Sequence, residues 1–363
     1  MEILFKAKVE LIYNLRAMRL FKTTSWFITV LVVAIFTSCA GGQKKSNQAE
    51  TVSEQPATQP VEINNEAKLL LQYFESNGDY VNSREFPSLI KAASVFEELN
   101  GKIHIIDLRG PKSFAEGHIK GAVKVDFTEL PEYFSAKIKP FEFDKIIVVC
   151  YSGQISSYAT SLLRLMGYGN VYAMRWGMSG WIKDLAYQWL DAISSEYEGK
   201  LELTENGKAA PGDFPVIGSG KETGDEIADA QFKRLFEAGW EDALISAEKV
   251  FEQPDKYYII NYERKDKYDS GHIPGALRYK TNDFLGIVSE MQTIPADKEI
   301  VVYCGTGHNS GFATAYLRLF GYNAKTLTYG NNAFMHNKMV AEKDQLSWLP
   351  FTEAEIGDYP VVK

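Results

Sequence analysis

The stretch "VVYCGTGHNS", residues 301–310, decides the fold of this 363-residue chain. A hydrophobic run ends at Cys304, two glycines follow at once, and a helical pattern begins at Ser310. The stretch "VVCYSGQIS", residues 148–156, repeats this arrangement around Cys150. Short hydrophobic runs bounded by glycine are typical of buried strands. The sequence therefore predicts that each thiol lies at the end of a strand, before a loop with few side chains.

The two stretches belong to an internal repeat. Residues 150–168 align without gaps on residues 304–322, a shift of 154 positions. The same shift places "FAEGHIKGA" (114–122) on "YDSGHIPGA" (268–276). Self-similarity at a fixed spacing indicates a repeated structural unit. The chain therefore holds two copies of one domain.

The length and the repeat divide the chain into five segments. We predict a signal peptide (1–38), a lipidated cysteine with a flexible tether (39–64), domain 1 (65–195), a linker (196–224) and domain 2 (225–357). The linker is rich in glycine and charge, a composition that fits both a flexible connection and an ordered strap between the domains.

Each copy shows the alternating pattern of an α/β domain. Short runs that are apolar on both faces are typical of a parallel sheet buried between helix layers. In domain 1 these predicted strands are 102–107, 122–126, 145–150 and 170–174. Alternating strands and helices imply a parallel sheet with right-handed crossovers. We therefore expect two domains, each a parallel sheet flanked by helices, with ligands bound beyond the carboxyl ends of the strands.

A helix follows each cysteine loop. Ser156 and Ser310 are predicted to cap its first turn, because a serine hydroxyl accepts from the free N–H groups there. Gly167 and Gly321 are predicted to end the helix in a left-handed conformation.

The loop between strand and helix is suited to an anion. Successive backbone N–H groups in a short loop converge on one point, and the helix N-terminus adds partial positive charge. A thiol in that field loses its proton more easily, and the thiolate is the nucleophile. The loop therefore favours a small sulfur anion attached to the cysteine.

Both copies resemble rhodanese domains, sulfurtransferases that carry sulfur as a cysteine persulfide. The resemblance lies in the strand–cysteine–loop–helix element and in "IDLRGPKSFAEGHIKGA", residues 106–122, which is similar to the Asp-x-Arg…Gly-His-Ile-x-Gly-Ala signature of the family. It covers most of residues 85–185 and 245–335.

The resemblance implies a role for each site residue. Cys150 and Cys304 would carry the persulfide, and Asp107 and Arg109 would support the first loop. The backbone amides of the loops would bind the persulfide, through Tyr151, Ser152, Gly153, Gln154 and Ile155 in domain 1 and Gly305, Thr306, Gly307, His308 and Asn309 in domain 2. It implies no cofactor, and as partners a small sulfur donor and a thiol or protein acceptor.

Domain 2 departs from the signature in its charges. Asn261 and Glu263 stand where domain 1 has Asp107 and Arg109. If Glu263 points toward the loop, it should disfavour an anionic donor or a thiolate. A protonated His308 would restore a positive charge. Neither loop carries Arg or Lys, so polysulfides, small persulfides or a partner's persulfide fit as donors as well as thiosulfate does. We expect domain 1 to be the more active.

The histidines of the two "GHI" turns and two tryptophans are predicted to have structural roles. His118 and His272 of the two "GHI" turns are predicted to bond backbone groups, and Trp176 and Trp181 to lie in the core. No His and Cys cluster has the spacing of metal ligands, so no metal site is predicted.

The N-terminus predicts export. An apolar run, 26–36, follows basic residues and is too short for a membrane span. It ends at "TSCAGG", which resembles a bacterial lipoprotein signal with Cys39 as the lipidated residue. Met1 and Met18 both fit as the start of translation. We expect a lipid-anchored protein of a bacterial cell envelope, facing the periplasm or the cell surface.

Composition argues against a nucleic-acid-binding protein, and the cysteine loops argue against a phosphatase. With 39 basic and 47 acidic residues and no basic cluster in the domains, nucleic acid is not expected as a partner. A related phosphatase fold needs an arginine six places after the cysteine, where this chain has Ser156 and Ser310. The alternative to a sulfurtransferase is a rhodanese-fold binding or scaffolding module at the membrane with little turnover.

Overall fold

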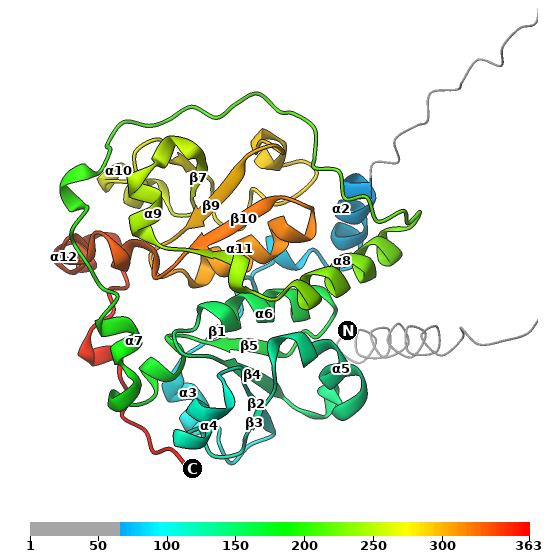
Figure 1. Cartoon of the computed structure of the whole chain (residues 1–363), viewed down its shortest axis with the longest axis vertical. Coiled ribbons are helices and arrows are strands. Elements are labelled where there is room, and N and C mark those ends of the chain that lie inside the picture. Colours follow the sequence, from blue (N-terminus) through cyan, green and yellow to red (C-terminus); the bar gives the residue numbers. More distant parts are fainter. Residues whose placement is uncertain (1–65) are drawn as a thin grey trace, which may run out of the picture. The chain divides into compact units, whose positions relative to one another are not determined.

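The computed structural model describes residues 66–363, which form two five-stranded sheets (Figure 1). The strand order is β1-β5-β4-β2-β3 in the first sheet and β6-β10-β9-β7-β8 in the second, so the same topology occurs twice. All neighbouring strands are parallel. The predicted α/β fold with two parallel sheets flanked by helices is confirmed.

The strands of the first sheet agree closely with the prediction. They are β1 (Leu89–Ile90), β2 (Ile103–Asp107), β3 (Ala122–Lys124), β4 (Lys145–Val149) and β5 (Val171–Met174). Those of the second sheet are β6 (Leu244–Ile245), β7 (Tyr257–Asn261), β8 (Leu277–Arg278), β9 (Glu299–Tyr303) and β10 (Asn323–Leu327). The edge strands β1 and β6 were not predicted as strands, because two residues are too few to show a period.

Helices cover the sheets and connect their strands. In chain order they are α2 (Glu66–Ser76), α3 (Ala92–Glu97), α4 (Pro111–Glu116), α5 (Leu130–Glu132), α6 (Gln154–Leu165), α7 (Tyr187–Leu190), α8 (Gly224–Ala238), α9 (Ala247–Glu252), α10 (Lys265–Ser270), α11 (His308–Leu319), α12 (His336–Ala341) and α13 (Lys343–Leu346). Within residues 66–363 none of them combines the length and apolar character that a bilayer span requires. Gly167 and Gly321 follow α6 and α11 with φ of 101° and 89°, as predicted.

Helices α6 and α11 pack against each other between the two sheets (Figure 1). Each helix therefore has one face on its own sheet and another on its partner, and nearly all of its residues are buried. The contact is close because its residues are small. A Cβ added to Gly311 would lie 3.3 Å from both the Gln154 carbonyl oxygen and the Ser157 Cβ. The Ser161 hydroxyl donates to the Phe312 carbonyl at 2.9 Å.

The first residues of these two helices reach into the opposite domain. The Tyr329 N–H of domain 2 donates to Gln154 Oε1 at 2.8 Å. His308 occupies the equivalent place in domain 2, and its Nε2 lies 3.1 Å from the Ser152 carbonyl oxygen and 3.3 Å from the Trp176 nitrogen of domain 1. His308 therefore contacts the Cys150 loop of domain 1, and Gln154 contacts the turn after β10 that supports the Cys304 loop.

Segments at the ends of each half also cross over. Phe74 of α2 contacts the rings of Phe232, Tyr316 and Phe320 in the second half. Helix α8 of the second half likewise contacts the first half, because the Phe236 ring lies 5.1 Å from the ring of Phe127.

Two isolated β-bridges pair segments that lie far apart in the sequence. Glu202, which follows the first half, pairs with His272, and Val362, which follows the second, pairs with His118. The two halves therefore contact each other through helices, loops and terminal segments, and the cysteine loops lie within this contact.

His308 is enclosed between the two domains and is fully buried. Its ring lies 5.2 Å from the Trp176 ring and 5.8 Å from the Trp189 ring. Burial, with the charge of Arg175 adding to it, lowers the pKa of His308 to about 3. The imidazole is therefore neutral in the folded protein throughout the physiological pH range.

The buried His308 makes stability depend on pH. The unfolded chain binds a proton at this residue near pH 6.5 and the folded chain does not, so stability is lost as pH falls below 6.5. This residue alone should cost about 2 kcal/mol of unfolding free energy between pH 7 and pH 5. The variant His308→Gln carries at position 308 the residue type that domain 1 has at Gln154. Urea unfolding at pH 7 and pH 5 should show that the acid-induced loss of unfolding free energy is about 2 kcal/mol smaller in this variant than in the wild-type protein. An equal acid loss in both proteins would contradict the assignment.

Candidate functional site

Cys150 lies directly after β4, with its sulfur at the start of α6. The Gly153 N–H donates to Cys150 Sγ at 3.1 Å and the Ser156 N–H at 3.4 Å. The Ser156 hydroxyl oxygen lies 3.5 Å from the same sulfur. The thiol is free and its residue is 1% exposed. Convergent N–H donors at a helix N-terminus stabilise negative charge on the sulfur or on an atom attached to it.

Cys304 has the same position after β9, with fewer donors on its sulfur. The Ser310 N–H donates to Cys304 Sγ at 3.4 Å, and the Ser310 hydroxyl lies 3.5 Å away. This thiol is also free, and its residue is 2% exposed. The structure thus places both predicted cysteines and both loops at the carboxyl ends of parallel strands, at equivalent points of the two domains.

The predicted serine caps are wrong by three residues. Helix α6 begins at Gln154 and α11 at His308, with Gly153 and Gly307 as N-caps. These glycines have φ of 88° and 78°, a region that other residues rarely adopt, so the chain turns into the helix earlier than expected. Ser156 lies within α6 and its hydroxyl donates back to the Gly153 carbonyl at 3.0 Å.

In domain 1, Asp107 and Arg109 form a buried pair beside the loop. Arg109 Nη2 lies 2.7 Å from Asp107 Oδ2, and Nε lies 3.1 Å from both carboxylate oxygens. Nη2 also donates to the Gly117 carbonyl at 2.7 Å, which ties the pair to the "GHI" turn. The guanidinium carbon lies 5.8 Å from the ring centre of the loop residue Tyr151, and Nη1 is buried without a hydrogen-bond partner. A cation with an unused donor therefore lies beside this loop.

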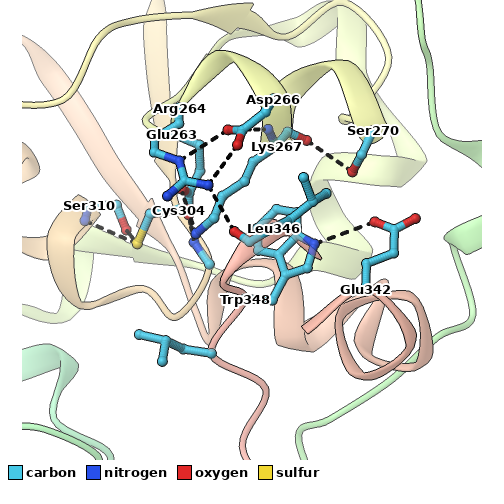
Figure 2. Close-up of polar contacts among 12 residues, drawn as sticks. Glu263, Arg264, Asp266, Lys267, Ser270, Cys304, Ser310, Glu342, Leu346 and Trp348 are labelled. Atoms are coloured by element: carbon cyan, nitrogen blue, oxygen red, sulfur yellow. Dashed lines mark hydrogen bonds and ion pairs between the residues drawn. The ribbon is translucent and has the colours of Figure 1, made fainter. Parts of the chain in front are cut away.

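In domain 2, a carboxylate is turned into the loop (Figure 2). Glu263 Oε1 accepts a hydrogen bond of 2.6 Å from the Gly305 N–H, the first amide after Cys304. The other oxygen, Oε2, lies 3.3 Å from Lys267 Nζ, and both side chains are nearly buried. The Glu263 side chain therefore faces the loop, which is the orientation in which it should disfavour an anionic donor.

The other charged residues near this loop point elsewhere. Arg264 binds Asp266 and the Leu346 carbonyl at the surface, as Figure 2 shows, so it does not reach the loop. His308 does not supply a positive charge at Cys304, because burial lowers its pKa to about 3 and its Nε2 faces domain 1. Asn261, at the place of Asp107, is buried.

The two histidines of the "GHI" turns have the predicted structural role. His118 Nδ1 lies 2.9 Å from the Phe114 carbonyl oxygen, and His272 Nδ1 lies 2.9 Å from that of Tyr268. Trp176 and Trp181 are buried, as predicted.

Three supporting residues were missed from the sequence. Lys267 is one helical turn after Glu263, and this Glu–Lys spacing was a detectable signal. Trp176 and Tyr329, with φ of 66° and 62°, lead the turns that support the loops. The Met178 N–H donates to the Cys150 carbonyl and the Asn331 N–H to that of Cys304. The repeated aromatic–glycine pairs after β5 and β10 were the corresponding signal.

Two predictions concern other parts of the chain. Cys39 and the signal peptide lie outside the described residues. Within residues 66–363, His, Cys, Asp and Glu side chains form no group of three that could hold a metal ion.

Comparison with known proteins agrees with this geometry. The family model of the rhodanese-like domain matches residues 92–184 and 238–337, more than half of the chain. The thiosulfate sulfurtransferase GlpE of Stutzerimonas stutzeri is 37% identical over 78 residues, covering 21% of this chain and 68% of its own. GlpE of Pseudoalteromonas translucida is 35% identical over 94 residues, covering 25% and 86%.

Among solved structures, the 3-mercaptopyruvate sulfotransferase SseA from Escherichia coli is 20% identical. It covers 66% of this chain and 97% of its own, with a TM-score of 0.26. The repeated cysteine loops and the two matched regions establish that this chain belongs to the rhodanese-like domain family.

Proposed function

We propose that the protein is a sulfurtransferase that carries sulfane sulfur as a persulfide on Cys150 and, to a lesser extent, on Cys304. The observation that carries this proposal is the pair of N–H groups, from Gly153 and Ser156, on Cys150 Sγ at the start of α6. Membership of the rhodanese-like family and relatives named thiosulfate sulfurtransferases support sulfur transfer in general.

The proposed reaction has two steps. The Cys150 thiolate attacks the terminal sulfur of a donor, the S–S bond of the donor breaks, and the leaving group departs with the electron pair. From thiosulfate the leaving group is sulfite. A thiolate acceptor then attacks the outer sulfur of the persulfide, which releases the Cys150 thiolate and leaves the persulfide on the acceptor. The loop N–H groups hold the negative charge of the persulfide between the steps.

The charges beside the loops support a larger share for domain 1. The Arg109 guanidinium lies beside the Cys150 loop, whereas the Glu263 carboxylate accepts the first N–H of the Cys304 loop. A nearby cation favours a thiolate and an incoming anion, and a nearby carboxylate opposes both. The pairing of Arg109 with Asp107 reduces this difference, so a several-fold advantage is expected and not a thousandfold one.

A binding or scaffolding module is the second candidate. The observation that favours it is the burial of both cysteines, which are 1% and 2% exposed, so a donor needs a local opening to reach either sulfur. Fold membership is compatible with both functions.

We also propose that the protein is anchored to a bacterial cell envelope through a lipid on Cys39. The sequence "TSCAGG" after a short apolar run supports this proposal.

Single replacements of the two cysteines test the sulfurtransferase. With thiosulfate as donor and a dithiol as acceptor at neutral pH, Cys150→Ala should lose most of the activity. Cys304→Ala should keep most of it, because Cys150 has the cationic neighbour. Initial rates of sulfite release measure the difference. If Cys304→Ala abolishes transfer and Cys150→Ala leaves it unchanged, access to the sulfur and not local charge decides. If the wild-type chain and both variants show no measurable sulfite release, the binding module is favoured.

Replacement of Cys39 tests the anchor. The wild-type protein should partition into the detergent phase with membranes, and Cys39→Ser should be released or should keep residues 1–38. Fractionation with mass spectrometry of the N-terminus distinguishes these outcomes. Wild-type protein found in the soluble fraction with residues 1–38 intact would refute the proposal.

A further inference from the structure

The loop of Cys304 differs from that of Cys150 in the charged side chain that contacts its backbone. Its first amide, the Gly305 N–H, is occupied by the Glu263 carboxylate at 2.6 Å. In domain 1 no acidic side chain is seen on the corresponding amide of Tyr151 among the hydrogen bonds of the described residues. The first amide of this loop is therefore already bound by a carboxylate and is not free to donate to an incoming anion.

The carboxylate is held in this place by its surroundings. Lys267 Nζ lies 3.3 Å from Glu263 Oε2 and 4.5 Å from the centre of the Trp348 ring. Figure 2 shows Glu263 and Lys267 between the Cys304 loop and Trp348. The lysine therefore offsets part of the charge of Glu263 through Oε2, while Oε1 stays on the Gly305 amide and faces the loop.

The wall beside Gly305 also contains two apolar side chains. A Cβ added to Gly305 would lie 3.1 Å from Glu263 Oε1 and 3.9 Å from both Met339 Cε and Trp348 Cε3. Such a wall accepts an alkyl group readily and solvates a dianion poorly.

We propose that Glu263 is the specificity-determining residue of domain 2, and that Cys304 takes its sulfur from alkyl persulfides, RSSH, in preference to the thiosulfate dianion. This inference rests on the proposed sulfurtransferase function and adds a substrate class to one of its two sites. The two domains then share one reaction and differ in the charge of the donor that they admit.

The chemistry is the same for both donors. With RSSH, the Cys304 thiolate attacks the terminal sulfur, the S–S bond breaks, and the thiolate RS⁻ leaves with the electron pair and takes up a proton. With thiosulfate the leaving group is the sulfite dianion, and the donor itself brings two negative charges to a loop that already holds the Glu263 carboxylate. The carboxylate therefore raises the barrier for thiosulfate selectively.

Charge can be removed from Glu263 with little change of shape. Glutamine keeps a side-chain oxygen that accepts from the Gly305 N–H, so Glu263→Gln removes the charge and retains the hydrogen bond. Lys267→Met should act in the opposite sense, because it leaves the carboxylate without its counter-charge. Asp266→Asn is the matched control, since Asp266 is a carboxylate of α10, the helix of Lys267, and binds Arg264 at the surface.

The experiment uses the full chain with Cys150→Ala, so that Cys304 alone reports in the domains. Two donors are compared, thiosulfate and the persulfide of 2-mercaptoethanol, and peptide mass mapping follows the initial rate of sulfur addition at Cys304. Glu263→Gln should raise the thiosulfate-to-persulfide rate ratio about tenfold, and Lys267→Met should lower it by a similar factor. Asp266→Asn should leave the ratio unchanged.

The outcomes separate this inference from the proposed function. If Cys150 of the wild-type chain gains sulfur but the ratio at Cys304 is the same in Glu263→Gln and Asp266→Asn, the inference is wrong and the function stands. Sulfur uptake at Cys150 with none at Cys304 from the alkyl persulfide also overturns it. If neither cysteine of the wild-type chain gains sulfur from either donor, the proposed function itself fails.

Discussion

The contact between α6 and α11 determines where both cysteine loops lie. Each helix begins immediately after its loop, so whatever fixes the first turn of the helix also fixes the amides around the sulfur. Gln154 and His308, at equivalent positions of the repeat, cross this contact and bind backbone groups of the opposite domain. Gly153 and Gly307 permit the approach, because a side chain at Gly153 would collide with His308. The two sites are therefore built as one unit, although each domain has a complete sheet of its own.

Within this symmetric frame the two sites differ in charge. Domain 1 keeps the Asp107–Arg109 pair, with the guanidinium near the loop residue Tyr151. Domain 2 has Glu263 on the first loop amide, with Lys267 behind it. Backbone geometry is thus nearly repeated in the two domains, while the charges beside the two loops differ.

The sequence predicted the elements that depend on local pattern and missed those that depend on the contact between domains. The runs that became β2 and β4 were apolar on both faces, and the repeat located both cysteines at strand ends. His308 was assigned to its own loop, because nothing local indicates that its ring crosses to Ser152 of the other domain. The N-cap of each helix was placed three residues late, since a glycine cap depends on backbone conformation and a serine pattern does not reveal it. Glu263 was identified by register alone, and the four-residue spacing to its partner Lys267 was a sequence signal that was missed.

Location of the transferred sulfur tests the central claim most directly, namely that the amides around Cys150 hold a persulfide. The full wild-type chain is incubated with a sulfane-sulfur donor, the excess donor is removed, and the peptides are mapped by mass spectrometry under non-reducing conditions. The account predicts an added mass of about 32 Da, one sulfur atom, on the peptide that contains Cys150, and its loss on treatment with a thiol. An unmodified Cys150 peptide after exposure to thiosulfate and to alkyl persulfides alike would contradict it.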